Sequence, residues 1–91
     1  MSQQCSVEVR IINKLGLHAR PAMSFVDLAS SFQSEVLVSR GDQEVDGKSI
    51  MHMMLLAATQ GTTLTILAKG PDAQKAVEAL KALVDQGFDE E

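Results

Sequence analysis

Two hydrophobic periods alternate along the chain, and the points where they switch divide it into seven predicted elements. A period of two, typical of strands with one face on a core, occupies residues 7–11, Glu35–Arg40, Gln43–Asp46 and residues 62–68. Steps of three and four residues, typical of amphipathic helices, occupy residues 19 to about 31, 50 to about 58, and a last segment that starts after residues 70–72. The predicted order is strand, helix, strand, strand, helix, strand, helix.

Prolines and glycines agree with these boundaries. Pro21 falls in the first turn of the first helix, where its missing N–H group costs no intrahelical bond. Gly87 suits the C-terminal cap of the last helix. We expect Phe88 to pack back against the domain and residues 89–91 to form a solvated tail.

The polar faces of the strands favour an antiparallel sheet with helices on one side only. The predicted fold class is α+β, an open-faced β-sandwich in which three helices cover one side of a four-stranded antiparallel sheet. Its 91 residues are enough for a single domain, residues 1–91, with no linker or low-complexity segment.

Composition narrows the possible functions. The net charge of −4 and the absence of Trp and Tyr argue against a nucleic-acid binder, which needs a basic face and stacking aromatics. Cys5 is the only cysteine, so the chain has no disulfide framework, and its spacing from the two histidines suggests no metal site. We therefore expect neither a metal nor a cofactor.

The chain also shows no targeting pattern. It has no positively charged start followed by an apolar run, and no stretch approaches the ~18 consecutive apolar residues of a membrane span. We expect a cytoplasmic monomer that does not insert into membranes.

The candidate chemistry lies at His18, which follows a glycine turn and begins the first predicted helix. A helix start exposes unpaired N–H groups and a partial positive charge. A phosphoryl group on the ring could bond to the N–H groups of Ala19 and Arg20 and to the Arg20 guanidinium. The same positive environment favours a neutral, nucleophilic ring.

From the residues alone, a second interpretation stays open: His18 caps the helix and Arg20 is incidental. The stretch has no adjacent carboxylate base, no metal cluster and no Gly-rich triphosphate loop, all of which a catalyst would use. A protein that carries a phosphoryl group between partners is therefore favoured over the alternative, a small catalytic domain that acts on phosphoesters.

At this point the sequence resembles a known family. The stretch GLHARPAM (residues 16–23) closely resembles the active-site signature of the HPr family, the phosphocarriers of the phosphoenolpyruvate-dependent phosphotransferase system. The stretch GKSIMHMMLLAA (residues 47–58) resembles that family's regulatory-serine region. Together with the order of elements, the resemblance covers nearly the whole chain.

The resemblance implies a mechanism and partners. Enzyme I, which takes its phosphate from phosphoenolpyruvate, would phosphorylate His18 on ring Nδ1. The phosphate would pass to a IIA component of a sugar permease or to a regulatory counterpart, and Arg20 would stabilise it. The implied fold is the same open-faced sandwich of four strands and three helices.

Ser49 precedes an apolar helical run, which makes it a helix N-cap candidate that contributes ~1 kcal/mol. The resemblance implies that it is also the target of an ATP-dependent HPr kinase/phosphorylase in those bacteria that have one. Phosphate is tolerated at a helix N-terminus, so this modification should change docking and leave the fold intact. His52, three residues later, is interpreted as a solvated interface residue.

Four apolar residues near these sites have two interpretations. Met23 falls off the buried stripe of its helix, and Ile50, Met51 and Met54 cannot all face inward, with Leu55, on one short helix. They are either core residues with some incidental exposure or an apolar rim beside His18 that docks partners. The resemblance favours the docking rim for Met51 and Met54, with Met23 and Ile50 as further docking candidates.

Two questions stay open within the family. The ending GFDEE together with GKSIM resembles carriers of proteobacteria, where a sugar branch and a nitrogen-regulatory branch both occur. The tail favours the nitrogen-type relatives. The alternative function is a regulatory binding protein of the same family, but such members are expected to lack the acceptor histidine, and His18 is present.

Overall fold

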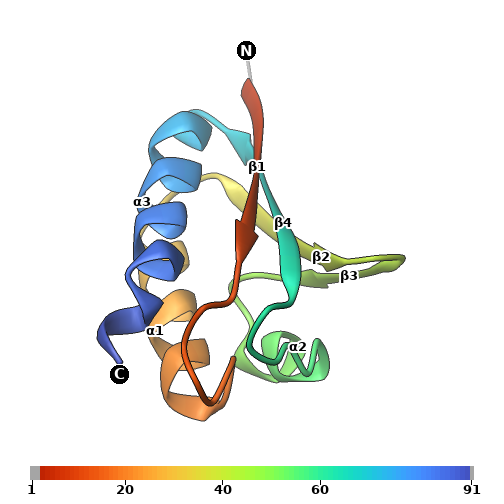
Figure 1. The fold of residues 1–91 in the computed structure, drawn as a ribbon. Helices are drawn as coiled ribbons and strands as arrows, with labels where there is room; N and C mark the ends of the chain where they lie inside the picture. The colour runs from red at the N-terminus through yellow and green to blue at the C-terminus, as the bar shows by residue number, and fades with distance from the viewer. Residues whose placement is uncertain (1–2, 91) are drawn as a thin grey trace.

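The computed structural model describes residues 3–90, which form four strands, three α-helices and a short C-terminal 3₁₀ turn, η1 (Figure 1). The elements are β1 (Gln3–Arg10), α1 (Ala19–Ser30), β2 (Glu35–Arg40), β3 (Gln43–Asp46), α2 (Ile50–Leu55), β4 (Thr63–Gly70), α3 (Ala73–Asp85) and η1 (Gly87–Asp89). The predicted order of strands and helices is confirmed.

The strands form one antiparallel sheet in the order β1-β4-β2-β3. The first and last strands of the chain thus lie next to each other, and β4 pairs with β1 on one side and β2 on the other. Ile66 in β4 lies opposite Val7 in β1 and Val38 in β2. Because alternate residues point to one face, Val38 and Ile66 are fully buried beneath the helices.

Helices α1 and α3 lie together against the sheet, with α2 beyond the end of the strands (Figure 1). Helices α1 and α3 each bury an apolar stripe, including Phe25 in α1 and Leu80 in α3, whereas α2 buries only Met53. The predicted fold class, an open-faced sandwich with three helices on a four-stranded antiparallel sheet, is confirmed. No helix within residues 3–90 is both long and apolar enough to cross a membrane.

Helix α2 is shorter than predicted, since it ends at Leu55 rather than near residue 58. Ala57 has a positive φ of 47°, which no right-handed helix contains. The carbonyls beyond the helix have acceptor roles elsewhere: Leu17 donates its N–H to the Ala58 carbonyl at 2.8 Å, and the Arg40 guanidinium donates to the Leu56 carbonyl at 2.8 Å. These tertiary bonds use carbonyls that would have no partner within a helix ending near residue 58, and the positive φ of Ala57 ends the helix ahead of that residue.

The end of α3 follows the prediction more closely. Gly87, with φ of 64°, comes directly after the capping residue Gln86, and Phe88 is buried. The left-handed conformation at a helix C-terminus is the one that glycine adopts without steric cost. The chain therefore turns back toward the start of α1.

Candidate functional site

His18 is the N-cap residue of α1, with extended backbone angles (φ −81°, ψ −173°). Its carbonyl accepts the first helical bond, from the Ala22 N–H group at 3.0 Å. Its side chain forms no capping hydrogen bond to the helix. His18 therefore occupies the capping position, as the second interpretation expects, but its side chain does not cap the helix, and the ring, 36% exposed, is available for other contacts.

The loop before His18 is fastened at several points. Leu17 bonds to the Ala58 carbonyl, and Gly16 has a φ of 66° and lies so close to the backbone at residues 58–59 that a Cβ atom would come within 2.5 Å of the Ala58 oxygen. Only glycine fits such a close approach with that φ value. The position of the ring is therefore set by the backbone on both sides of it.

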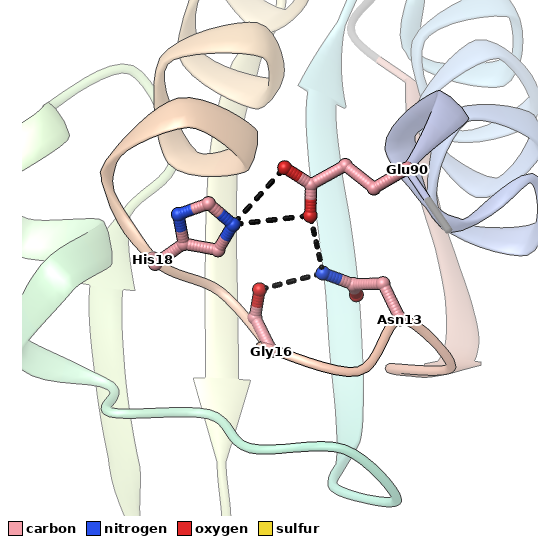
Figure 2. A network of polar contacts seen from close by, with 4 residues as sticks. All are labelled: Asn13, Gly16, His18 and Glu90. Carbon is pink, nitrogen blue, oxygen red and sulfur yellow. Dashed lines mark hydrogen bonds and ion pairs between the residues drawn. The ribbon is translucent and has the colours of Figure 1, made fainter.

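The imidazole is held from one side by a carboxylate at the other end of the chain. Its Nε2 atom lies 3.0 Å from each carboxylate oxygen of Glu90, which is 17% exposed (Figure 2). The prediction that residues 89–91 form a solvated tail is wrong for Glu90, holds for the exposed Asp89, and lies outside the described residues for Glu91. No carboxylate lies next to His18 in the sequence, but the fold brings the Glu90 carboxylate against its ring.

Asn13 holds the carboxylate in turn. Its side-chain Nδ2 donates to Glu90 Oε1 at 3.0 Å and to the Gly16 carbonyl at 2.7 Å (Figure 2). Asn13 is 97% buried (3% exposed), and its Oδ1 has no hydrogen-bond partner within residues 3–90. Leaving Oδ1 buried without a partner costs free energy. The two hydrogen bonds that Nδ2 donates fix the orientation of the amide and join the glycine turn to Glu90.

These contacts keep Glu90 ionised. They lower its pKa from the ordinary value, with the hydrogen bond from His18 as the largest cause; burial opposes this, and Asn13 and the charges of His18 and Arg20 add to it. An ionised carboxylate only accepts hydrogen bonds, so the proton of the pair lies on His18 Nε2. In the neutral ring, the lone pair is then on Nδ1, the nitrogen that Figure 2 shows on the side away from Glu90.

Arg20 supplies positive charge close by. It is exposed and lines an open hollow of roughly 540 Å³ together with Glu90, Asp89 and Phe88. Ala19 and Arg20 are the first two residues of α1, so their N–H groups have no acceptor within the helix. A helix start with an adjacent guanidinium is suited to bind an anion.

No group of three or more His, Cys, Asp or Glu side chains that could hold a metal ion occurs within residues 3–90. The groups that the described residues bring to the site are the His18 imidazole, the Glu90 carboxylate, the Arg20 guanidinium and the backbone N–H groups at the start of α1. They suit an anion bound covalently or reversibly at the Nδ1 side of the ring.

Ser49 is the N-cap of α2, as predicted, with an extended backbone, and its hydroxyl accepts from the His52 N–H group at 3.3 Å. His52 is exposed, and its ring Nδ1 accepts from the Asp46 N–H group at 3.3 Å. The two residues are thus joined locally, within one turn of the helix.

The four apolar residues considered for docking are all exposed: Met23, Ile50, Met51 and Met54, with Met51 at 77%. Met23 is in α1 and the others are in α2, and these two helices contact each other. Leu15, in the loop before His18, is also exposed. Here "apolar rim" denotes Met23, Ile50, Met51 and Met54; it occupies the helices that adjoin His18.

Sequence reasoning missed Asn13 and Glu90. The only available signal for Glu90 was Phe88, since a buried aromatic two residues earlier brings the following backbone close to the domain. For Asn13, the signal was an amide directly after the apolar pair at residues 11–12. Neither signal shows which residue the side chain contacts. Glu90, for example, is 72 positions away from His18 in the sequence.

The chain is similar to known proteins over most of its length. Residues 5–86 match the family model described as the PTS HPr component phosphorylation site. A phosphocarrier protein HPr from Cupriavidus necator is 49% identical over 83 residues, covering 91% of this chain and 93% of the relative. A phosphocarrier protein NPr from Shewanella violacea is 43% identical over 83 residues, covering 91% of each chain.

Solved structures agree with these sequence relatives. HPr-C-His from Thermoanaerobacter tengcongensis superposes with a TM-score of 0.92 at 42% identity, over 96% of this chain and 98% of that one. Crh, a catabolite-repression protein of Bacillus subtilis, superposes with a TM-score of 0.75 at 43% identity, over 87% of this chain and 91% of that one.

Proposed function

Because the chain belongs to the HPr family of phosphocarrier proteins of the phosphotransferase system, we propose that His18 accepts a phosphoryl group from phospho-Enzyme I and passes it to a IIA-type component. The observation that carries this proposal is the arrangement of the ring. Nε2 is occupied by Glu90, and Nδ1 has the free lone pair at the start of α1. Nδ1 is therefore the proposed phosphorylated atom.

The surroundings of Nδ1 support the same proposal. The phosphoryl oxygens would bind the N–H groups of Ala19 and Arg20 and the Arg20 guanidinium. Bonds from backbone and arginine stabilise a phosphate without activating water, since neither is a base at neutral pH. Such a site suits a carrier, which must keep the group until a partner takes it.

The test uses phosphoenolpyruvate labelled in its phosphate, with and without Enzyme I. We expect label on the protein only when Enzyme I is present, and none on His18→Ala, which should retain its stability within about 1 kcal/mol as a surface substitution. His52→Ala is the matched control, because it removes the only other histidine and should keep the label. Label on His18→Ala would contradict the proposal, and label without Enzyme I would favour the catalytic rival.

The apolar rim is proposed to dock Enzyme I and the IIA acceptor. Flexible methionine side chains adapt to more than one partner surface, and the rim lies on the two helices next to His18. The relatives include both HPr and NPr proteins. Which IIA component accepts the phosphoryl group therefore decides whether the protein acts in the sugar branch or in the nitrogen branch. Offering the phosphorylated protein to sugar-branch and nitrogen-branch IIA components, and measuring which one takes the label, distinguishes the two.

We also propose that Ser49 is a target of HPr kinase/phosphorylase in a host that has this enzyme. Its hydroxyl lies at the start of a helix, where the partial positive charge tolerates a phosphate. Because Ser49 adjoins Ile50 and Met51 of the rim, added charge there would act on docking.

The carrier is proposed to be a cytoplasmic monomer. Strand β1 pairs with β4 of its own chain along its whole length, from Gln3 opposite Gly70 to Arg10 opposite Thr63. Crh and an HPr from Thermoanaerobacter tengcongensis are described as dimers, the former with a swapped domain. Light scattering after size-exclusion chromatography, at several protein concentrations, tests the oligomeric state.

A further inference from the structure

Glu90 reaches His18 through an unusual backbone path. Gly87, Phe88 and Asp89 have φ values of 64°, 57° and 60°, so three successive residues adopt the left-handed conformation. For Phe88 this conformation costs about 1–2 kcal/mol, whereas the short polar side chain of Asp89 tolerates it better. The burial of the Phe88 ring and the bonds of Glu90 to His18 and Asn13 offset this cost.

The carboxylate is held as a defined group rather than as a mobile surface charge. Both of its oxygens lie at hydrogen-bond distance from Nε2, and Oε1 also accepts from the buried Asn13 amide. The amide is itself tied to the glycine turn that precedes His18. The imidazole, the carboxylate and the amide therefore form one connected unit on the Nε2 side of the ring (Figure 2).

We infer that Glu90 is a positioning residue for phosphoryl transfer at His18: it keeps the proton on Nε2 and stabilises the positive ring that exists while Nδ1 carries the phosphoryl group. This inference rests on the proposed function. It adds a residue from the far end of the chain that acts through the imidazole and does not touch the phosphate.

The transfer step shows why the charge matters. As the bond between the phosphorus and its donor atom on phospho-Enzyme I breaks and its electron pair leaves with that donor, the Nδ1 lone pair forms a new N–P bond, and the Nε2 proton stays in place. The ring is then a phosphoimidazolium, whose positive charge faces the Glu90 carboxylate. When the acceptor takes the phosphoryl group, the Nδ1–P electron pair returns to the ring, which leaves as neutral imidazole, and no proton needs to move.

Loss of the Nε2 proton from the phosphorylated ring would make the leaving group an imidazolate anion, which is a much poorer one. An anionic partner at 3.0 Å favours the protonated form. Two other charged residues line the same hollow as Glu90: Arg20, whose charge also lowers the Glu90 pKa, and the exposed Asp89. Of these three, Glu90 alone is bonded to the ring.

The experiment compares the wild type with Glu90→Gln, which keeps a neutral acceptor, and Glu90→Ala, which removes it. Asp89→Asn is the matched control, because it removes the same charge one residue away, on the same hollow. Rapid quenching measures the rate of transfer from phospho-Enzyme I. Nitrogen-15 NMR of the phosphorylated protein measures the pH at which the ring loses its Nε2 proton.

We expect Glu90→Gln to slow transfer to IIA about tenfold and to lower the pH of Nε2 deprotonation by about one unit, the effect of removing one close opposite charge. Glu90→Ala should be slower still, and Asp89→Asn should stay within twofold of the wild type. Loss of the Glu90 bonds should lower the unfolding temperature slightly, more in Glu90→Ala than in Glu90→Gln, but both variants should stay folded at the assay temperature, which separates positioning from a loss of fold.

Two results would overturn the inference: wild-type rates and deprotonation pH in both Glu90 variants, or an equal effect of Asp89→Asn, which would indicate a general charge effect. Both leave the proposed function standing, because the wild type is labelled in each case. A wild type that takes no label from Enzyme I would instead contradict the proposed function itself.

Discussion

At the scale of single residues, two opposing fields act on His18. The start of α1 disfavours a positive ring, whereas the Glu90 carboxylate favours one. The expectation of a simply neutral, nucleophilic ring included only the first of these fields. With both present, we expect a lone pair on Nδ1 in the unmodified ring and, under the proposed function, a positive charge that Glu90 stabilises in the phosphorylated ring.

Arg20 is expected to act on the phosphate and not on the fold. Replacing it with alanine should slow transfer from Enzyme I about 10–100-fold, since one charge-assisted bond contributes about 1.5–3 kcal/mol. Rapid-quench rates check this. Arg20→Lys should retain part of the rate, because lysine keeps the charge but lacks the planar two-pronged donor set. An unchanged rate in Arg20→Ala would remove Arg20 from the site.

At the scale of elements, Asp72 shows how one side chain joins the start of α3 to the start of β2. It occupies the N-cap position of α3, but its carboxylate makes no cap bond to that helix. It accepts instead from the N–H groups of Gln33 and Ser34, each at 2.9 Å, and from the buried Ser34 hydroxyl. The hydrogen bond from the Ser34 side chain is the largest cause that lowers the Asp72 pKa from 3.8 to about 2.

This lowered pKa makes a prediction about acid stability. The folded state holds Asp72 ionised more strongly than the unfolded state, so its stabilising effect is present above pH 4 and is lost as the pH falls from about 4 to about 2. The melting temperature of the wild type should fall more steeply over this interval than that of Asp72→Asn, measured by circular dichroism.

A matched control is Asp42→Asn, in the exposed turn between β2 and β3. Its melting temperature should follow the wild-type pH dependence. If the melting temperature of Asp72→Asn shows the same pH dependence as the wild type, the hydrogen bonds between Asp72 and Ser34 do not contribute to stability.

At the scale of the whole molecule, the β1–α1 loop, α2 and the C-terminal turn gather at one end of the sheet (Figure 1). This end combines His18, the apolar rim and Ser49, so a change at one of them can affect docking at another. Ser49→Asp should slow transfer from Enzyme I and keep the fold, because aspartate is as good an N-cap as serine. Transfer rates and melting temperature, measured together, check both parts.

Ser49→Ala is the matched control for that variant. It should lose about 1 kcal/mol of stability with the capping bond and keep the wild-type rate of transfer, because no charge is added. An unchanged rate in Ser49→Asp would contradict the regulatory role.

Met51 tests the docking surface itself. It is 77% exposed, so Met51→Glu should leave stability unchanged. Because burying a methionine contributes about 1.5–3 kcal/mol, placing a charge there should raise the KM for the carrier in the Enzyme I reaction at least ~10-fold. Gln74→Glu, in the first turn of α3 and exposed, should leave this KM unchanged. Equal KM values for both variants would exclude Met51 from the interface.

The sequence by itself determined the order and type of the elements, the aliphatic core and the place of His18 at a helix start. These features follow from periodicity and local steric preferences, which act over a few residues. Only the tertiary structure decided that α2 stops at Leu55, that Asp72 bonds to Ser34 and that Glu90 holds the ring of His18. Each of these depends on polar groups far apart in the chain that meet only once the core has formed, and no local pattern encodes such a meeting.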